Sequence, residues 1–386
     1  MALFFLISLG LHALVGWRVA PAWLNISAVA GYGLWALLML SALLTPMGLV
    51  AKRFAKPPMA AVLTWIGLLC MGLLSSLFVL TVLRDVLLLA AGVLHWVWPQ
   101  AVIVAGVSRS SALALPVVAL LVTVLGFWNA RRTATVVPVD IPVANLPKEL
   151  EGFTVAQISD IHVGPTIKTG YLQRIVNTVN GLNANMVAIT GDLVDGSVGD
   201  LAQHVAPLEQ LRSTHGTFFV TGNHEYYSGA HSWIDALRRL GITVLMNEHV
   251  VLHHHSDSQV PEQARIVVAG VTDFSAHHFD EDHRSDPRKA MQDAPDMAQF
   301  RMLLAHQPRS AAAAADAGFD LQLSGHTHGG QFWPWNHFVR FQQPFTAGLH
   351  KLRDMWVYTS RGTGYWGPPK RFGAPSEITR LRLVRA

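Results

Sequence analysis

The first third of this 386-residue chain contains almost no acidic residues. Asp85 is the only carboxylate among residues 1–130, whereas 17 of the 19 histidines and most of the charged residues lie in the remainder. The net charge of +4 therefore reflects an apolar region without carboxylates rather than a basic surface, and no basic stripe with interleaved aromatic residues occurs. We expect no nucleic-acid partner, and the sequence identifies no protein partner.

The chain also has a single cysteine, Cys70, which lies inside an apolar run. One cysteine excludes an internal disulfide and a metal site built from several thiolates. Any metal centre must therefore use imidazole, carboxylate or amide ligands. The cellular compartment has to be argued from the membrane segments instead of from cysteine usage.

Long apolar runs fill the region that lacks acidic residues. Four of them approach the roughly 17–25 residues needed to cross the hydrocarbon core of a bilayer: residues 2–17, 31–50, 59–83 and 112–128. We predict that residues 1–130 form a membrane anchor of about four transmembrane helices. The first run has no basic start and no clean small-residue cleavage site, so a removable signal peptide is the less favoured alternative.

Residues 86–97 are apolar but short, and Arg84 and Asp85 precede them, so we expect an interfacial or re-entrant helix here. Basic clusters follow the second and fourth runs; they contain Lys52, Arg53, Lys56, Arg131 and Arg132. The positive-inside rule predicts an inner (plasma) membrane protein with these clusters and the soluble part in the cytoplasm. Arg18, Arg84 and Arg109 oppose this orientation, and a fifth span at residues 86–100 would reverse it.

The composition of the sequence changes after the last apolar run. Residues 131–149 are extended and punctuated by proline, which is typical of a linker that leads into a first strand. Beyond them, short runs rich in β-branched residues, such as "FTVAQIS" (153–159) and "MVAIT" (186–190), alternate with helical periodicity. We therefore expect residues 150–386 to form an α/β domain, with ligands bound beyond the carboxyl ends of its strands.

The loops after these strands carry side chains that have no packing role at the end of a buried strand. They are Asp160 and His162 in "SDIH", Asp192 in "GDLVDG", Asn223 and His224 in "GNHE", His306 in "AHQP", and His326 and His328 in "GHTHGG". Carboxylate, amide and imidazole ligands suit Mn²⁺, Fe or Zn²⁺. Residues i and i+2 of an extended segment point the same way, so each spaced pair can hold an ion from one side.

These blocks, in this order, resemble the signature of the calcineurin-like metallophosphoesterase superfamily, and the resemblance covers about residues 150–384. The apolar runs before them resemble its membrane-anchored bacterial branch. The resemblance implies a two-sheet β-sandwich flanked by helices and two divalent metal ions (Mn, Fe or Zn). It assigns one ion to Asp160, His162, Asp192 and His328, and the other to Asp192, Asn223, His306 and His326. It makes His224 the catalytic histidine beside the substrate phosphate.

The activity expected from this resemblance is hydrolysis of a phosphodiester or pyrophosphate bond by a metal-activated hydroxide. A membrane anchor favours a lipid-linked substrate. The alternatives are a soluble nucleotide phosphodiesterase activity, or a transporter or scaffold with a regulatory phosphoesterase-like domain. Few ionisable residues lie in the apolar runs to form a transport pathway, and every position of the metal signature is filled, which disfavours an inactive scaffold.

Other polar and aromatic side chains have two interpretations each. Arg361, in the loop 360–375, and His278 are predicted substrate contacts, although that loop would equally close the sheet. The aromatic residues of 332–341 fill the sandwich edge or form an apolar lip. Asp195 and Glu225 support ligand histidines by hydrogen bonding or cap a turn.

Overall fold

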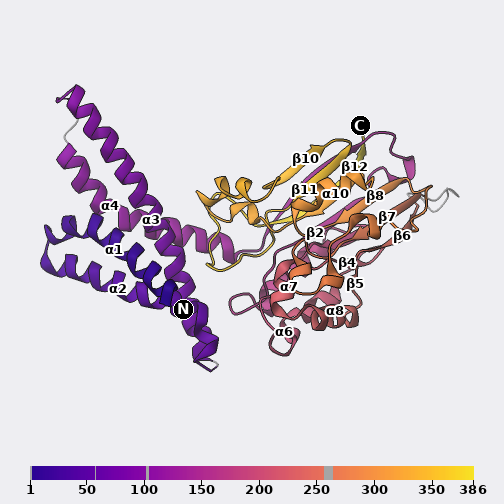
Figure 1. Cartoon of the computed structure of the whole chain (residues 1–386), viewed down its shortest axis with the longest axis horizontal. Helices are drawn as coiled ribbons and strands as arrows, with labels where there is room; N and C mark the ends of the chain where they lie inside the picture. Colours follow the sequence, from indigo (N-terminus) through magenta and orange to yellow (C-terminus); the bar gives the residue numbers. More distant parts are fainter. Residues whose placement is uncertain (1, 57, 101–103, 256–263) are drawn as a thin grey trace. The chain divides into compact units, whose positions relative to one another are not determined.

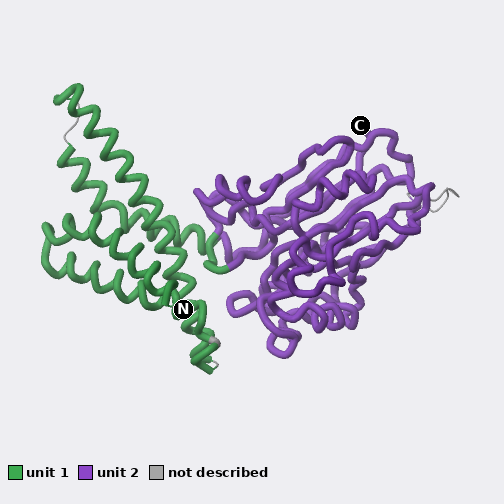
Figure 2. Tube along the Cα trace, in the orientation of Figure 1, with its two compact units in different colours: residues 1–128, 367–370 green, residues 129–366, 371–386 purple. Residues whose placement is uncertain are grey.

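The computed structural model describes residues 2–56, 58–100, 104–255 and 264–386. It divides into two compact units (Figure 2): residues 1–128 with 367–370, and residues 129–366 with 371–386. The first unit has a small core of apolar helix side chains. The second has three larger cores, one between its two sheets and one on the outer face of each sheet.

The first unit consists of long apolar helices: α1 (Ala2–Leu24), α2 (Ala28–Val50), α3 (Met59–Val97) and α4 (Val104–Arg131). All four have the length and hydropathy needed to cross a membrane. Gly48 of α2 and Gly67 of α3 let the two backbones meet, since a Cβ on Gly67 would lie 2.5 Å from the Cα of Gly48. Residues 367–370 also belong to this unit, and Lys370 donates to the carbonyl of Gly72 at 3.0 Å.

The expectation of a separate interfacial or re-entrant helix at residues 86–97 is wrong, because α3 continues unbroken through them for 39 residues. Arg84 does not end the helix, since its Nε donates to Ser111 Oγ at 3.0 Å. Asp85 accepts a hydrogen bond from Arg18 at 2.7 Å. Charges paired in this way are tolerated within a helix bundle. At about 1.5 Å per residue, α3 is about 58 Å long and exceeds a hydrocarbon core of about 30 Å.

The second unit is a sandwich of two six-stranded sheets flanked by helices (Figure 1). In sheet order, one sheet contains β1 (Thr135–Val143), β12 (Glu377–Arg385), β2 (Thr154–Ile158), β3 (Met186–Ile189), β4 (Thr217–Phe219) and β5 (Thr243–Val244). The other contains β10 (Gly348–Leu352), β11 (Met355–Thr359), β9 (Leu321–Ser324), β8 (Phe300–Leu304), β7 (Ala264–Gly270) and β6 (Glu248–His254). The α/β class and the two-sheet architecture expected from the sequence are confirmed.

Strands of both sheets are buried on both faces, which explains their nearly continuous apolar runs. Met186 and Ala188 of β3 pack between the sheets, whereas Val187 and Ile189 pack against the outer helices. These helices are α5 (Thr169–Asn180), α6 (Val198–Val205) and α8 (Ala230–Arg239), while α9 (Pro287–Ala290) and α10 (Ala311–Asp316) cover the other sheet. Strands β2 to β5 run parallel, so their carboxyl ends meet at one edge.

The segment 131–149, expected as a linker leading into a first strand, is part of the first sheet. Its strand β1 pairs in parallel with β12 from the far end of the chain. Ile141 and Leu146 are buried in the core between the sheets. The segment is therefore held by the sandwich instead of serving only as a connection.

Candidate metal centre

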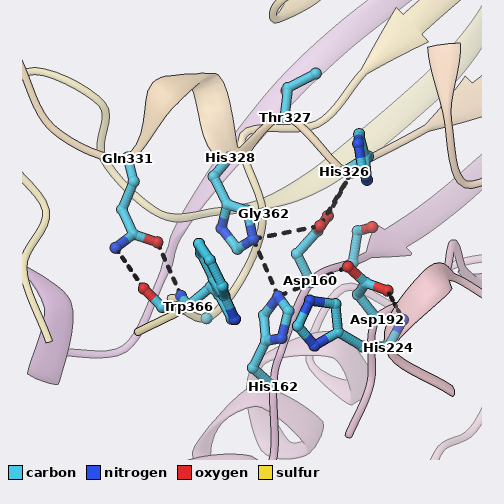
Figure 3. Close-up of polar contacts among 12 residues, drawn as sticks. Asp160, His162, Asp192, His224, His326, Thr327, His328, Gln331, Gly362 and Trp366 are labelled. Atoms are coloured by element: carbon cyan, nitrogen blue, oxygen red, sulfur yellow. Dashed lines mark hydrogen bonds and ion pairs between the residues drawn. The ribbon is translucent and has the colours of Figure 1, made fainter. Parts of the chain in front are cut away.

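The structure gathers the predicted ligand side chains at the carboxyl ends of strands from both sheets (Figure 3). Two groups contain only predicted ligands, each with ligand atoms within 4.8 Å of one another: Asp160, His162 and His328 in one, and Asp192, His306 and His326 in the other. An overlapping group joins them and consists of His162, Asp192 and His224. The two groups adjoin, because His162 Nε2 lies 3.9 Å from Asp192 Oδ2. Metal binding by each residue remains a prediction, but each residue lies beside other side chains that could bind the same ion.

Two of the histidines have one ring nitrogen occupied by a protein group, which leaves the other facing the cluster. His162 Nδ1 lies 3.0 Å from Asp195 Oδ1, and His306 Nδ1 lies 2.7 Å from the carbonyl oxygen of Thr190. This arrangement fixes the tautomer of a metal-binding histidine and directs its Nε2 at the ion.

Asn223 lies beside Asp192, whose Oδ1 accepts from the backbone N of His224 at 2.9 Å. The Asn223 side chain is buried, and its Oδ1 has no hydrogen-bond partner among the described residues. An unpaired buried amide oxygen costs about 1–3 kcal/mol unless something else satisfies it. A divalent ion would do so, and this orphaned oxygen is the clearest sign that the residues fit a metal.

Backbone strain is concentrated at the same residues. Five of the predicted ligands adopt a left-handed backbone conformation, with φ between 51° and 69°: Asp160, His162, Asp192, His326 and His328. Such conformations cost a non-glycine residue about 1–3 kcal/mol, and they persist only where the surrounding structure enforces them. These five residues lie on three turns, which lose local stability in order to direct the five side chains at one place.

Glycine is required at two points of contact with the carboxylates. A Cβ on Gly325 would lie 2.2 Å from Asp160 Oδ2, and a Cβ on Gly222 would lie 2.2 Å from Asp192 Oδ1. The glycines of "GH" and "GN" therefore let the backbones of β9 and β4 approach the carboxylates of the neighbouring turns.

Burial and neighbouring charges set opposite protonation preferences within the cluster. Burial alone would raise the pKa of Asp192, but His306 holds it well below its ordinary value. Burial raises the pKa of Asp160. Burial also lowers the pKa of His326 to about 3, with a further contribution from His306. Carboxylate charge and neutral imidazole are the forms that bind metal, and Asp192 and His326 favour them.

The predicted catalytic residue His224 lies directly beside the ligands, with one of its ring nitrogens within 4.8 Å of ligand atoms of His162 and Asp192. Its Nδ1 lies 2.6 Å from Asp195 Oδ1, and its ring packs edge-on against Tyr227 and Trp366. Burial opposes protonation, but the hydrogen bond to Asp195 and the charge of Asp192 raise the pKa of His224 to about 9. A cationic imidazole in this position could donate a proton to a departing oxygen.

Two further residues, Arg371 and Glu225, support the site. Arg371 is buried, and its Nη2 lies 3.0 Å from His328 Nδ1 while Nη1 donates to the carbonyl oxygens of His328 and Arg361. Glu225 accepts from backbone amides on the turns that carry Asp192 and Asn223, at 2.6–3.3 Å. The sequence predicted a supporting or turn-capping role for Glu225. Arg371 stands in the loop 360–375, which the sequence predicted to contact substrate or to close the sheet, and its side chain holds His328 instead.

The predicted substrate contacts lie outside the two ligand groups. Arg361 is paired with Glu377 at 2.9 Å and is partly exposed. His278 is exposed, with its ring 4.0 Å from that of His277. Both roles stay predictions. The aromatic side chains of 332–341 are partly exposed instead of filling the core: Trp333, Trp335, Phe338 and Phe341.

Residues 153–330 match the protein family described as calcineurin-like phosphoesterase. This chain belongs to that family. It is 38% identical over 291 residues to a "transmembrane protein with metallophosphoesterase domain" of Danio rerio, covering 74% of this chain and 65% of the relative. A protein of the same name from Bos taurus is 39% identical, covering 75% of this chain and 67% of the relative. An uncharacterized metallophosphoesterase of Campylobacter jejuni is 34% identical, covering 70% of this chain and 69% of the relative.

Membership of the calcineurin-like phosphoesterase family, together with the apolar helices, establishes a membrane protein with a metal-dependent phosphoesterase domain. The candidate ligand groups suit the divalent metals that the family uses. Relatives occur in bacteria and in vertebrates, so the resemblance is not confined to a bacterial branch. The chain spans about two thirds of the length of these relatives.

Proposed function

We propose that this chain is a membrane-anchored phosphoesterase that hydrolyses phosphodiester or pyrophosphate bonds at a centre for two divalent ions of Mn, Fe or Zn. The observation that carries the proposal is the position of Asp192 between two ligand groups. Its Oδ2 lies 3.2 Å from His306 Nε2 of one group and 3.9 Å from His162 Nε2 of the other. A carboxylate that serves two groups at once is what a bridged pair of ions requires.

In this proposal each ion has four protein ligands, with Asp192 common to both. One set is Asp160, His162, Asp192 and His328, and the other is Asp192, Asn223, His306 and His326. Two bound ions would supply charge to neutralise the phosphate oxygens and would lower the pKa of a water molecule. The chain's own part is to orient these ligands, through Asp195, Arg371 and Glu225, and to position His224.

His224 is proposed to act on the substrate and not on a metal. Since its Nδ1 is held by Asp195, its Nε2 is the nitrogen free to approach the ester. A protonated His224 would donate to the leaving oxygen or stabilise negative charge as it develops. His224→Gln should therefore reduce turnover by about 10²–10⁴-fold and leave bound metal unchanged.

The side chains around His224 support a substrate with an apolar part. Tyr227, Phe279 and Trp366 are each more than half exposed although they are large and aromatic. Tyr227 contacts both His224 and Phe279, with ring centroids 5.2 and 5.5 Å apart. We call Tyr227, Phe279 and Trp366 the aromatic rim. Because an exposed apolar rim beside a phosphate site suits an acyl or similar long chain, a lipid-linked phosphodiester or pyrophosphate is the substrate class we propose.

We further propose that residues 1–130 are the membrane anchor and that residues 131–149 lead from it into the catalytic domain 150–386, to whose first sheet they add β1. In this proposal the domain faces the cytoplasm at the inner membrane. Basic residues follow α2 and α4, as the positive-inside rule requires, and the opposing Arg18 is neutralised by Asp85. A reporter fused after Ala386 tests the orientation. Activity of a reporter that works only in the periplasm would overturn it.

The catalytic proposal is tested with full-length protein in detergent, loaded with Mn²⁺, Fe²⁺ or Zn²⁺. The substrates would be soluble phosphomonoesters, soluble nucleotide diesters and pyrophosphates, and the same esters carrying acyl chains in mixed micelles. We expect the highest kcat/KM for lipid-linked diesters or pyrophosphates, and no turnover by Asp192→Asn. A preference for soluble nucleotide diesters would favour the alternative, a soluble nucleotide phosphodiesterase activity. No hydrolysis with any metal would refute both functions.

A further inference from the structure

A further group of ligand-type side chains lies apart from the centre described above. It consists of His231, the second residue of α8, with Asp280 and His283 at the short helix η5 (Glu281–His283). One ligand atom from each lies within 4.8 Å of the others. His231 lies 49 positions before Asp280 in the sequence, outside the motif blocks of the main centre.

The distances within this group suit a single ion. Asp280 Oδ2 lies 2.9 Å from His231 Nε2 and 3.9 Å from His283 Nε2. In a tetrahedral zinc site with metal–ligand bonds of about 2.0–2.1 Å, neighbouring ligand atoms are about 3.3 Å apart. The two measured separations bracket this value, so small side-chain rotations would bring all three atoms to bonding distance.

The second polar atoms of Asp280 and His283 have partners outside the group, so the atoms that converge are Asp280 Oδ2, His231 Nε2 and His283 Nε2. Asp280 Oδ1 accepts from the backbone N of Asp282 at 3.1 Å. His283 Nδ1 lies 2.9 Å from the hydroxyl of Tyr226. A histidine whose second nitrogen is held by a protein group is typical of metal sites, because that contact fixes the tautomer and the ring orientation.

We propose that His231, Asp280 and His283 bind a further Zn²⁺-class ion, with water completing its coordination. Two imidazoles and one carboxylate favour Zn²⁺, Co²⁺ or Ni²⁺ over Mg²⁺ and Ca²⁺, which prefer oxygen ligands. The site is open to solvent, since the His231 side chain is 72% exposed while those of Asp280 and His283 are 29% and 17% exposed.

Such an ion would act on the aromatic rim. Phe279 directly precedes Asp280, and its ring lies 5.8 Å from that of Tyr226 and 5.5 Å from that of Tyr227. Binding therefore ties α8 to the segment that carries Phe279 and restricts the rim beside His224. The ion is a positioning element for the rim and not a participant in the reaction.

The test counts bound metal and does not depend on hydrolysis. Full-length protein in detergent would be stripped with chelator, equilibrated with Zn²⁺ and desalted, and its zinc would be measured by mass spectrometry. We expect His231→Ala to hold one equivalent less than the wild type. The matched control is His277→Ala, because His277 lies in the same segment but outside the group; it should match the wild type.

Two further variants keep the outcome clear. Asp192→Asn removes a ligand of the main centre. Protein that carries both Asp192→Asn and His231→Ala should hold one equivalent of zinc less than protein that carries Asp192→Asn alone. His283→Gln should lose the same equivalent as His231→Ala, and Co²⁺-loaded wild type minus either variant should show a tetrahedral absorption band. Equal zinc content in wild type and His231→Ala would overturn this site, whatever the result for phosphoesterase activity.

Discussion

Oδ1 of Asp195 lies 2.6 Å from Nδ1 of His224. The same oxygen lies 3.0 Å from Nδ1 of His162, so one carboxylate orients a proposed metal ligand and the proposed catalytic histidine together. Burial would raise the pKa of Asp195, but His162 and His224 hold it well below its ordinary value. Asp195 therefore stays ionised and couples the two functions of the site.

Replacing Asp195 by asparagine should impair both functions. An amide cannot hold two imidazoles through one charged oxygen, so we expect metal affinity and kcat each to fall by about 10–100-fold. Metal titration and steady-state kinetics on a chromogenic phosphodiester measure the two effects. Asp200→Asn on α6, at an exposed position, is the control. Unchanged kinetics in Asp195→Asn would show that His224 needs no such support.

Gly325→Ala should prevent assembly of the metal centre. The added Cβ would lie 2.0 Å from Ser159 Oγ and 2.2 Å from Asp160 Oδ2, so the Asp160 turn must shift. We expect loss of bound metal and a lower melting temperature. At Gly170 in α5, an added Cβ meets no described atom within 4 Å, and Gly170→Ala should be neutral or stabilise by about 0.5–1 kcal/mol. Equal metal content in both variants would contradict this account.

Arg371→Met should destabilise the second unit. The substitution leaves the carbonyl oxygens of His328, Arg361 and Gly364 without their buried donor. We expect unfolding to become easier by about 2–4 kcal/mol, measured by thermal or denaturant unfolding. Arg382→Gln breaks an exposed ion pair with Asp140 and should change stability little. If Arg371→Met and Arg382→Gln had the same melting temperature, Arg371 would have no structural role.

The paired histidines at the far end of the sandwich should make stability depend on pH. His215 Nε2 lies 3.0 Å from His254 Nδ1, and both rings pack on Phe153. Burial lowers the pKa of both histidines, and in His254 the charge of His215 adds to this. The unfolded chain therefore binds more protons than the folded chain below an unfolded pKa of about 6.5, so stability falls as pH drops below that value.

His254→Gln removes one of these groups. The loss of melting temperature between pH 7.5 and pH 5.5 should be smaller in this variant than in the wild type. Comparing the two proteins cancels the effects of other titrating groups. His253→Gln, at an exposed position of the same strand, serves as the control and should follow the wild type. An identical pH dependence in all three proteins would rule out the pair as the source.

Much of the site could be predicted because its residues stand in short sequence blocks. Asp160, His162, His326 and His328 stand in short blocks directly after apolar strands, and parallel strands deliver such blocks to one edge of a sheet. The four membrane runs were similarly visible, since about 20 apolar residues in sequence are themselves the physical requirement for a span. The extent of α3 was not, because Arg84 and Asp85 look like a helix boundary until their partners on α4 and α1 are known.

The sequence by itself determined the class of this protein: apolar helices for a membrane, and an ordered set of metal-binding blocks on an α/β scaffold. Only the tertiary structure decided that β1 pairs with β12, that Arg371 supports His328, and that His231 meets Asp280 and His283. The physical reason is the distance along the chain over which each kind of interaction acts. Periodicity and motif spacing act over a few residues, whereas these contacts join segments that are 40 to 240 residues apart and depend on how the whole chain packs.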